Sequence, residues 1–207
     1  APSSVQEMAD FVYLGFDLAF KYRNPAIILA DGIIGQMMEK VILPPIRPRR
    51  TEEEIRSQCP WALQGKPKGR KPNILTSLEL SPAVMEENNL RFQAKYREIE
   101  KNEIRYEAID CEDADYMIVA FGSLARICLK AQEMARAEGI KVGLLRPITL
   151  WPFPSDIIAE YAKKVKGIIS IELNAGQMVE DIRLAVNGTI DVKFYGRLGG
   201  IVPTPDE

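Results

Sequence analysis

The sequence predicts an α/β fold with a doubly wound, mostly parallel sheet in its C-terminal half. From residue 106 onward, apolar runs of strand length alternate with segments of helical period. Turn signals follow the helical segments, as at Gly139 and at Asn187-Gly188. This alternation is typical of right-handed strand–helix–strand units with helices on both faces of the sheet. We therefore assign residues 106–207 to one α/β domain.

The first 40 residues predict one helix followed by one strand. Ser4 and Glu7 form a capping-box pattern, and apolar residues recur behind it at helical spacing. Asn24-Pro25 ends the helix, and the apolar run 26–30 predicts a buried strand. One helix and one strand cannot bury a core. Residues 1–40 are therefore expected to be the end of a domain whose sheet this stretch does not supply.

The middle of the chain, residues 41–105, predicts a linker and a surface helix. Residues 41–73 contain six prolines and eight basic residues against three glutamates, which is typical of an inter-domain linker or surface arm. A basic arm can bind nucleic acid, but Trp61 is the only aromatic residue in this one, so we expect no nucleic-acid partner. Residues 83–104 are charge-rich with a thin apolar stripe, which predicts a helix on a surface.

The C-terminal elements follow in a regular order. The expected strands are residues 116–121, 141–145, 167–173 and 191–195, and the expected helices are 123–138, 155–165 and 176–186. Ser155 is the expected N-cap of the second of these helices. Residues 146–154 contain three prolines, so this connection can enter neither a helix nor the sheet. It is either a hydrophobic plug or a contact for a ligand or partner.

Composition excludes several kinds of site. The 207-residue chain has no histidine, which removes the commonest general base and metal ligand. Cys59, Cys111 and Cys128 are far apart, so we expect no iron–sulfur cluster or structural zinc on this chain alone. Free thiols suit a reducing cytoplasm, where we expect the protein. No apolar run has the length of a membrane span, and a net charge of -2 gives no attraction to membrane or nucleic acid.

Two strand-to-helix junctions are candidate ligand sites, because open α/β sheets bind ligands at the carboxyl ends of their strands. Gly122-Ser123 opens a helix whose free backbone N–H groups could hold a phosphate. A tight turn with Ser123 as N-cap is the favoured alternative. Asn174 and Gln177 lie at the equivalent junction, between the expected strand 167–173 and the expected helix 176–186. Capping of that helix by Asn174 is again the favoured alternative. These four are the candidate cofactor-crevice residues, and no catalytic or metal-binding residue is assigned.

Three charged residues accompany these junctions. Glu172 and Asp31 each follow an apolar run, so each carboxylate is either a buried, paired group or a ligand contact. Arg146 could form a bidentate pair with either acid or with an anionic ligand, and an internal salt bridge is the favoured use.

Five sequence motifs carry a family resemblance. They are residues 3–8 (SSVQEM), 31–39 (DGIIGQMME), 146–154 (RPITLWPFP), 171–181 (IELNAGQMVED) and 194–200 (FYGRLGG). In this order they resemble the alpha (pyrimidine-domain) subunit of thiamine-diphosphate-dependent 2-oxoacid:ferredoxin oxidoreductases. The chain looks most like the C-terminal part of the 2-ketoisovalerate (branched-chain) type. Proteins of that type tend to carry proline where Lys40 stands, so this position departs from the pattern.

The resemblance implies a transketolase C-terminal-like domain preceded by a long linker and by the helix–strand end of a pyrimidine-binding domain. It implies oxidative decarboxylation of a 2-oxoacid to an acyl-CoA, with electrons passed to ferredoxin. Thiamine diphosphate with Mg and iron–sulfur clusters would serve the full complex, with none expected on this chain alone. The implied partners in an oligomer are a pyrophosphate-domain (beta) subunit, a ferredoxin-like iron–sulfur subunit, ferredoxin and coenzyme A. The activating glutamate would precede Ala1, so this chain is expected to be structural and inactive alone.

Two other hypotheses compete with this one. The chain could be a stand-alone α/β module that binds a small anionic ligand at Gly122-Ser123 and Gly176. It could also be a purely structural assembly domain. Binding of thiamine diphosphate, coenzyme A or nucleotides to the purified chain would discriminate between these classes.

Overall fold

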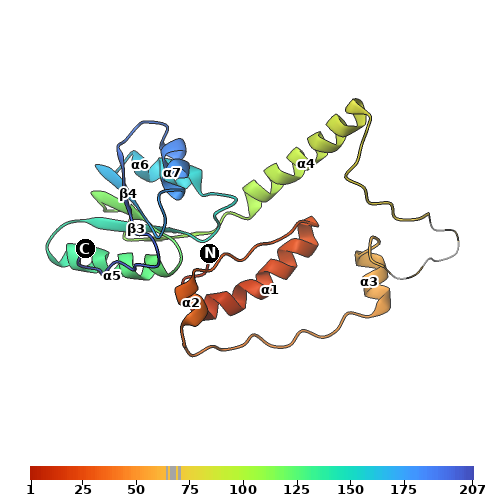
Figure 1. Cartoon of the computed structure of the whole chain (residues 1–207), viewed down its shortest axis with the longest axis horizontal. Helices are drawn as coiled ribbons and strands as arrows, with labels where there is room; N and C mark the ends of the chain where they lie inside the picture. The colour runs from red at the N-terminus through yellow and green to blue at the C-terminus, as the bar shows by residue number, and fades with distance from the viewer. Residues whose placement is uncertain (64, 66–68, 70) are drawn as a thin grey trace. The chain divides into compact units, whose positions relative to one another are not determined.

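The computed structural model describes residues 1–63, 65, 69 and 71–207. The chain forms two compact units, one made of Ala1–Leu43 with Lys95–Glu207 and the other of Pro44–Ala94. The first unit contains the sheet, three helices packed on it, and an N-terminal segment, which we define as residues 1–43 (Figure 1). None of the described helices is long and apolar enough to cross a membrane.

The sheet has five strands in the order β1-β3-β2-β4-β5. The parallel strands β2, β3, β4 and β5 confirm the predicted α/β class, while β1 adds an antiparallel edge next to β3. In β2 the side chains alternate between the two faces, with Met117 and Val119 in one core cluster and Ile118 in the other. The bounds are β1 Tyr106–Ile109, β2 Tyr116–Val119, β3 Val142–Pro147, β4 Gly167–Glu172 and β5 Val192–Gly196. Arg146 and Pro147 lie opposite Glu107 and Tyr106 of β1, so the expectation that residues 146–154 cannot enter the sheet is wrong for these two residues. Pro147 is tolerated because it is the last residue of its strand.

Helices cover both faces of this sheet, as the doubly wound prediction requires (Figure 1). Leu124 and Cys128 of α5 (Ser123–Ala137) pack in one core cluster. Ile158 of α6 (Ser155–Ala162) and Ile182 of α7 (Met178–Val186) pack in the other. Pro154 precedes α6 with no side-chain cap, so the expected N-cap role of Ser155 is wrong, because this serine is already the first helical residue.

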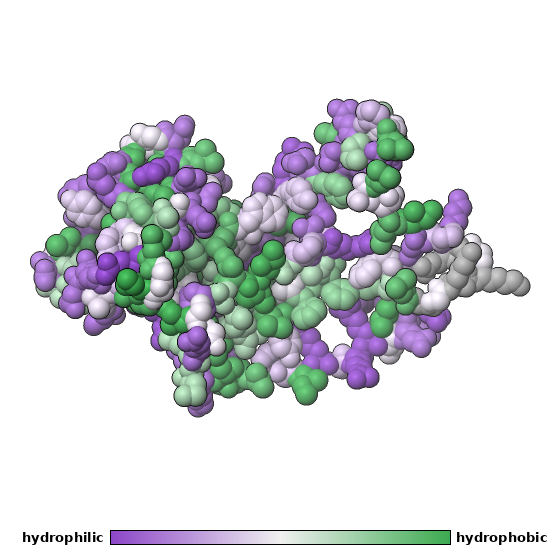
Figure 2. Space-filling model, in the orientation of Figure 1, coloured by the Kyte–Doolittle hydropathy of each residue, from purple (hydrophilic) through white to green (hydrophobic). Residues whose placement is uncertain are grey.

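The N-terminal segment contains α1 (Val5–Tyr22) and the short α2 (Gly32–Gln36). Ser4 caps α1 as predicted, since its side chain accepts a hydrogen bond from the Glu7 backbone N–H. No residue of α1 is buried, and hydrophobic residues reach the surface around this helix (Figure 2). The helix is therefore apolar without being covered, which is unusual for a helix of this length.

Residues 25–30 follow α1 and form no strand, in contrast to the prediction. Within the part of the chain that is described, no backbone hydrogen bond joins them to another segment. The side chains still alternate as they do in a strand: Ile27 and Leu29 are exposed, whereas Ile28 lies against Gly15 of α1. A strand exists only when a neighbour pairs with its backbone, and this segment has no such neighbour.

The predicted surface helix is α4 (Pro82–Asn102), and Ile99 is its one buried residue. This helix begins in the second unit and ends in the first. The second unit contains α3 (Glu52–Gln58), which the sequence analysis missed inside the proline-rich stretch. Thr51 and Glu54 form a complete capping box at its start. This pattern of Thr followed by Glu three residues later was the available signal for α3.

Candidate functional site

The carboxyl ends of the parallel strands β2, β3 and β4 form one edge of the sheet, where the N-terminal segment is bound. Arg146 lies at this edge in β3, Gly122 follows β2, and Glu172 ends β4. Ligands bind at this edge in open α/β sheets, so it is the candidate functional site.

Arg146 ties β3 to the first turn of α1. Its Nη1 and Nη2 atoms donate to the two carboxylate oxygens of Glu7 at 2.8 and 2.7 Å, and Nη1 also donates to Ser3 Oγ. The Nε atom lies 3.0 Å from a carboxylate oxygen of Glu107 in β1. The internal salt bridge predicted for Arg146 is present, but its partners are Glu7 and Glu107 rather than Asp31 or Glu172.

The ionisation of Glu7 follows from this pairing. Burial alone would raise the pKa of this carboxyl, but hydrogen bonds from Arg146 and Ser3 outweigh burial and lower the pKa to about 2. Since the Arg146 side chain is only 5% exposed, the guanidinium depends on these carboxylates for compensation of its charge. The ion pair is therefore a structural tie and not a ligand site.

The amino end of α5, where a phosphate was considered, holds a carboxylate from the same chain. Asp31 Oδ2 accepts the Ser123 backbone N–H at 2.8 Å, while Oδ1 accepts the N–H groups of Ile33 and Ile34 and caps α2. Gly122, with φ of +66°, is the N-cap residue of α5, so the expectation that Ser123 caps the helix is wrong. These hydrogen bonds outweigh burial and lower the pKa of Asp31.

The amino end of α7 is filled in the same way. Glu172 is buried, and its carboxylate accepts the backbone N–H groups of Gln177, Met178 and Val179 at 2.8 to 3.0 Å and the Ser170 hydroxyl at 2.9 Å. Burial would raise the pKa of Glu172, but these donors outweigh burial and lower the pKa. Of the two uses considered for Glu172, the structure shows the buried and paired one.

The remaining candidate residues surround this carboxylate without capping α7. Asn174 Oδ1 accepts the Gly176 N–H at 2.7 Å, so the expected helix cap by Asn174 is wrong and its side chain closes a turn instead. Gln177 has an exposed side chain and directs its backbone N–H to Glu172. Gly122 and Ser123 thus surround Asp31, while Asn174 and Gln177 lie near Glu172. The structure does not bring the four together around one crevice.

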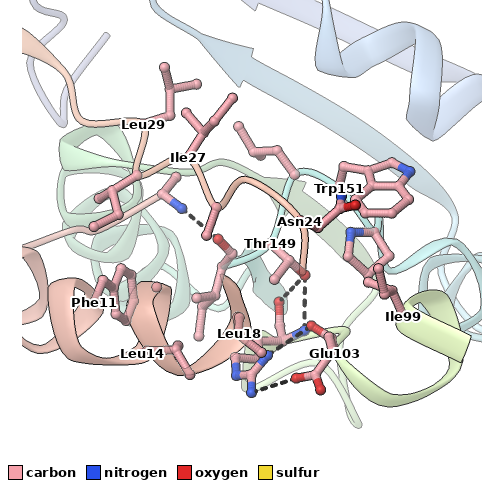
Figure 3. Close-up of a pocket in the computed structure, with 18 of the residues that line it drawn as sticks. Phe11, Leu14, Leu18, Asn24, Ile27, Leu29, Ile99, Glu103, Thr149 and Trp151 are labelled. Atoms are coloured by element: carbon pink, nitrogen blue, oxygen red, sulfur yellow. Dashed lines mark hydrogen bonds and ion pairs between the residues drawn. The ribbon is translucent and has the colours of Figure 1, made fainter. Parts of the chain in front are cut away.

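A cavity of about 500 Å³ lies between α1, the extended residues 24–29 and the loop 148–152 (Figure 3). Phe11, Leu14 and Leu18 point toward it from α1, and Trp151 closes one side. Tyr96 packs edge-on against Trp151 with ring centroids 5.8 Å apart. The cavity walls are mainly apolar. The loop 148–152 therefore lines this cavity in addition to connecting β3 with α6.

One end of the cavity is polar and fully paired. Glu103 accepts hydrogen bonds from Lys21 Nζ at 2.7 Å, Tyr22 Oη at 2.6 Å and Arg105 Nη2 at 3.0 Å. Burial would raise the pKa of Glu103, but these donors outweigh it and lower the pKa to about 2. Sequence analysis missed this cluster because Glu103 is one of several acids in and just after the charged helix α4, and no local pattern indicates that it is buried.

Residues 1–109 match the family described as "Pyruvate flavodoxin/ferredoxin oxidoreductase, thiamine diP-bdg". Residues 114–207 match "Pyruvate:ferredoxin oxidoreductase core domain II". The first region ends with β1 and the second begins just before β2, so the second match covers four of the five strands and the three helices packed on the sheet.

Similar proteins support these matches. The ketoisovalerate oxidoreductase subunit VorB of Methanothermobacter thermautotrophicus is 48% identical over 97% of this chain and 55% of its own length. The 2-oxoglutarate synthase subunit KorA of Methanocaldococcus jannaschii is 32% identical over 100% of this chain and 60% of its own. This chain therefore spans little more than half the length of these relatives.

A solved structure also resembles this chain. It is the 2-oxoglutarate:ferredoxin oxidoreductase from Magnetococcus marinus with 2-oxoglutarate, coenzyme A and succinyl-CoA bound. It is 28% identical, with a TM-score of 0.55, and the match covers 62% of this chain and 22% of that one.

Proposed function

Because this chain belongs to the pyruvate flavodoxin/ferredoxin oxidoreductase family, we propose that it is part of a 2-oxoacid:ferredoxin oxidoreductase. The complete enzyme would decarboxylate a 2-oxoacid oxidatively, form an acyl-CoA and pass the electrons to ferredoxin. The observation that carries this proposal is the order of the two family matches along one chain, at 1–109 and 114–207. Relatives that are subunits of ketoisovalerate and 2-oxoglutarate enzymes support the reaction class.

We propose a branched-chain 2-oxoacid as the substrate and the alpha-type subunit as the identity of this chain. The 48% identity to a ketoisovalerate oxidoreductase subunit, against 32% to a 2-oxoglutarate synthase subunit, supports the branched-chain choice. A thiamine-binding region followed by core domain II supports the subunit type. The partners would be the beta subunit, an iron–sulfur subunit, ferredoxin and coenzyme A.

Thiamine diphosphate, when bound, would supply the electron sink for decarboxylation. The described residues do not fit a diphosphate and metal site of their own. The acids Glu7, Asp31, Glu103 and Glu172 are each engaged by protein donors. No cluster of three His, Cys, Asp or Glu suited to a metal occurs in the described part of the chain. We therefore assign the chemistry to the complete enzyme.

The role we propose for this chain is architectural. Residues 1–40 would be the end of the thiamine-binding domain, residues 41–105 a linker and surface helix, and residues 106–207 the second domain. The unpaired extended backbone of residues 25–30, with Ile27 86% exposed, supports the first assignment. In the complete domain a neighbouring strand would pair with this backbone, and α1 would cover one face of the resulting sheet.

Reconstitution tests the proposal. We expect the chain alone to lack 2-oxoacid-dependent reduction of ferredoxin. Joining it to the remaining length of the family's subunit, with the beta and iron–sulfur subunits, should produce activity with branched-chain 2-oxoacids. Activity with 2-oxoglutarate alone would contradict the substrate, and turnover by the isolated 207-residue chain would contradict the architectural role.

The competing function is a stand-alone module for a small anionic ligand. The geometry disfavours it, because internal carboxylates fill the amino ends of both α5 and α7. An added phosphate at either place would lie against a carboxylate of lowered pKa and be repelled.

A further inference from the structure

The cavity between α1, residues 24–29 and the loop 148–152 has no role in the proposed function (Figure 3). Its walls belong to the first unit but come from both family-matched regions, since Leu14 and Leu18 lie in residues 1–109 and Trp151 lies in residues 114–207. Its volume of about 500 Å³ lies within the range of small-molecule pockets, which form preferentially where two domains meet. Its size and position therefore suit a small ligand.

Most of the cavity requires an apolar ligand. Phe11, Leu14 and Leu18 point into it from α1, and Ile27 and Leu29 lie across it from Glu103 (Figure 3). Ile27 is 86% exposed and Leu29 is 55% exposed. Covering these side chains removes apolar surface from water, which is the main favourable contribution to the binding of an apolar group. An alkyl chain, which has no polar group to leave unpaired, meets this requirement.

The polar end of the cavity carries a net positive charge. Glu103 is the one acid among the described lining residues, and Lys21 and Arg105 both pair with it. Two cations against one carboxylate leave a charge of +1. Lys21 and Arg105 also have more N–H donors than their hydrogen bonds to Glu103 use. Charge and donors are therefore available for one anionic group of a ligand.

We propose that this cavity binds a medium-chain aliphatic carboxylate, with its alkyl chain against α1 and its carboxylate beside Arg105. The proposal concerns binding to this chain and does not depend on the proposed reaction. A cationic ligand fits less well, because Glu103 already accepts hydrogen bonds from three donors. A strand paired with residues 25–30 in the complete domain would use backbone groups, whereas this ligand contacts side chains, so one does not replace the other.

Isothermal titration calorimetry of the full 207-residue chain tests the proposal with ligands that differ in length or head group. We expect saturable binding of octanoate, with an affinity that rises about threefold to fourfold for each CH₂ added between butanoate and octanoate. Octanol and octylamine should each bind about fivefold or more weakly than octanoate, because neither supplies an anion. Absence of saturable octanoate binding, or equal binding of the three head groups, would overturn the proposal.

A substitution on α1 locates the bound ligand. Leu14→Trp fills the cavity and should weaken octanoate binding about tenfold or more. Val12→Trp is the matched control, because Val12 lies on the same helix, is 42% exposed and does not line the cavity. This control should stay within about twofold of wild type, and circular dichroism should show unchanged helix content in both variants. Equal octanoate affinities of the two variants would place the ligand elsewhere and overturn the proposal.

A second substitution tests the head group. Arg105→Gln should weaken octanoate about fivefold while the affinity for octanol stays within about twofold. Arg91→Gln removes the same charge from an exposed position on α4 and should change neither affinity. Equal loss of octanoate and octanol in Arg105→Gln would contradict the carboxylate contact. Sedimentation velocity gives one further outcome: a chain that dimerises, and that Leu14→Trp makes monomeric, would assign the cavity to a second copy and overturn the proposal.

Discussion

The amino ends of α5 and α7 both hold a carboxylate of this chain, but the two carboxylates come from different places. Glu172 is five to seven residues from the N–H groups it accepts and is buried under α7. Asp31 is 92 residues from Ser123 and belongs to the partly exposed N-terminal segment. The same interaction therefore stabilises a helix within the domain in one case and joins two distant segments in the other.

This difference predicts which parts of the protein each interaction controls. Loss of the Glu172 carboxylate should weaken the whole α/β domain, because it leaves buried donors without acceptors. Loss of a tie to the N-terminal segment should loosen that segment while the sheet stays folded, because local opening requires breaking only the local contacts.

Substitution of the buried acid should have the largest effect. Glu172→Ala removes the acceptor of three backbone N–H groups and one hydroxyl, and should lower the free energy of unfolding by about 3 kcal/mol or more. Urea unfolding followed by circular dichroism measures this change. Glu180 is an exposed acid on α7, and Glu180→Ala should lower the free energy of unfolding by only a few tenths of a kcal/mol. Equal effects of the two substitutions would show that Glu172 is not a buried cap.

The next effect concerns the ion pair at β3. Arg146→Met leaves Glu7 and Glu107 without their shared cation and should cost about 2 to 3 kcal/mol. The matched control is Arg126→Met, because Arg126 pairs with Glu39 in a more exposed position and should contribute less than 1 kcal/mol. Hydrogen exchange should rise first in α1. Exchange that rises equally in α7 would contradict a local tie.

Measuring unfolding free energy as a function of pH tests the contribution of Glu7 to the same ion pair. Glu7→Gln should destabilise the chain by about 1 to 2 kcal/mol at neutral pH. The pKa of Glu7 in the folded chain, about 2, lies below the ordinary glutamate pKa of 4.5, so the stabilisation by its ionised carboxylate is complete above pH 4.5. The difference between wild type and variant should therefore shrink as the pH falls from 4.5 to 2. If the difference in unfolding free energy instead grew as the pH fell, the folded-state pKa of Glu7 would not be lowered.

The smallest effect should come from Asp31, the partly exposed carboxylate at the amino end of α5. Asp31→Asn keeps an oxygen that can cap α2 but removes the charge at the amino end of α5, which should cost about 1 kcal/mol or less. Amide exchange should increase at Ile33, Ile34 and Ser123 while the amides of α7 stay protected. If Asp31→Asn unfolded the sheet as Glu172→Ala does, the comparison between the two helices would fail.

Sequence periodicity predicted the sheet and its helices because those elements depend on local alternation of apolar residues. It found β2 to β5 and both helix-covered faces, and it placed Glu172 correctly at a strand end. It could not find the partners of the charged groups. Glu7 and Arg146 are 139 residues apart, and no local pattern connects them. The expected strand at 26–30 shows the same limit, since pairing of a strand depends on a neighbour that periodicity does not report.

The chain's own carboxylates, Asp31 and Glu172, already fill both of its candidate anion sites. Titration of the uniformly ¹⁵N-labelled chain with inorganic phosphate and pyrophosphate, read by amide chemical shifts, tests this claim most directly. We expect the amides of Ser123, Gln177, Met178 and Val179 to show no saturable shift at millimolar concentrations of either anion. Saturable shifts confined to these amides would show an accessible anion site and contradict the account.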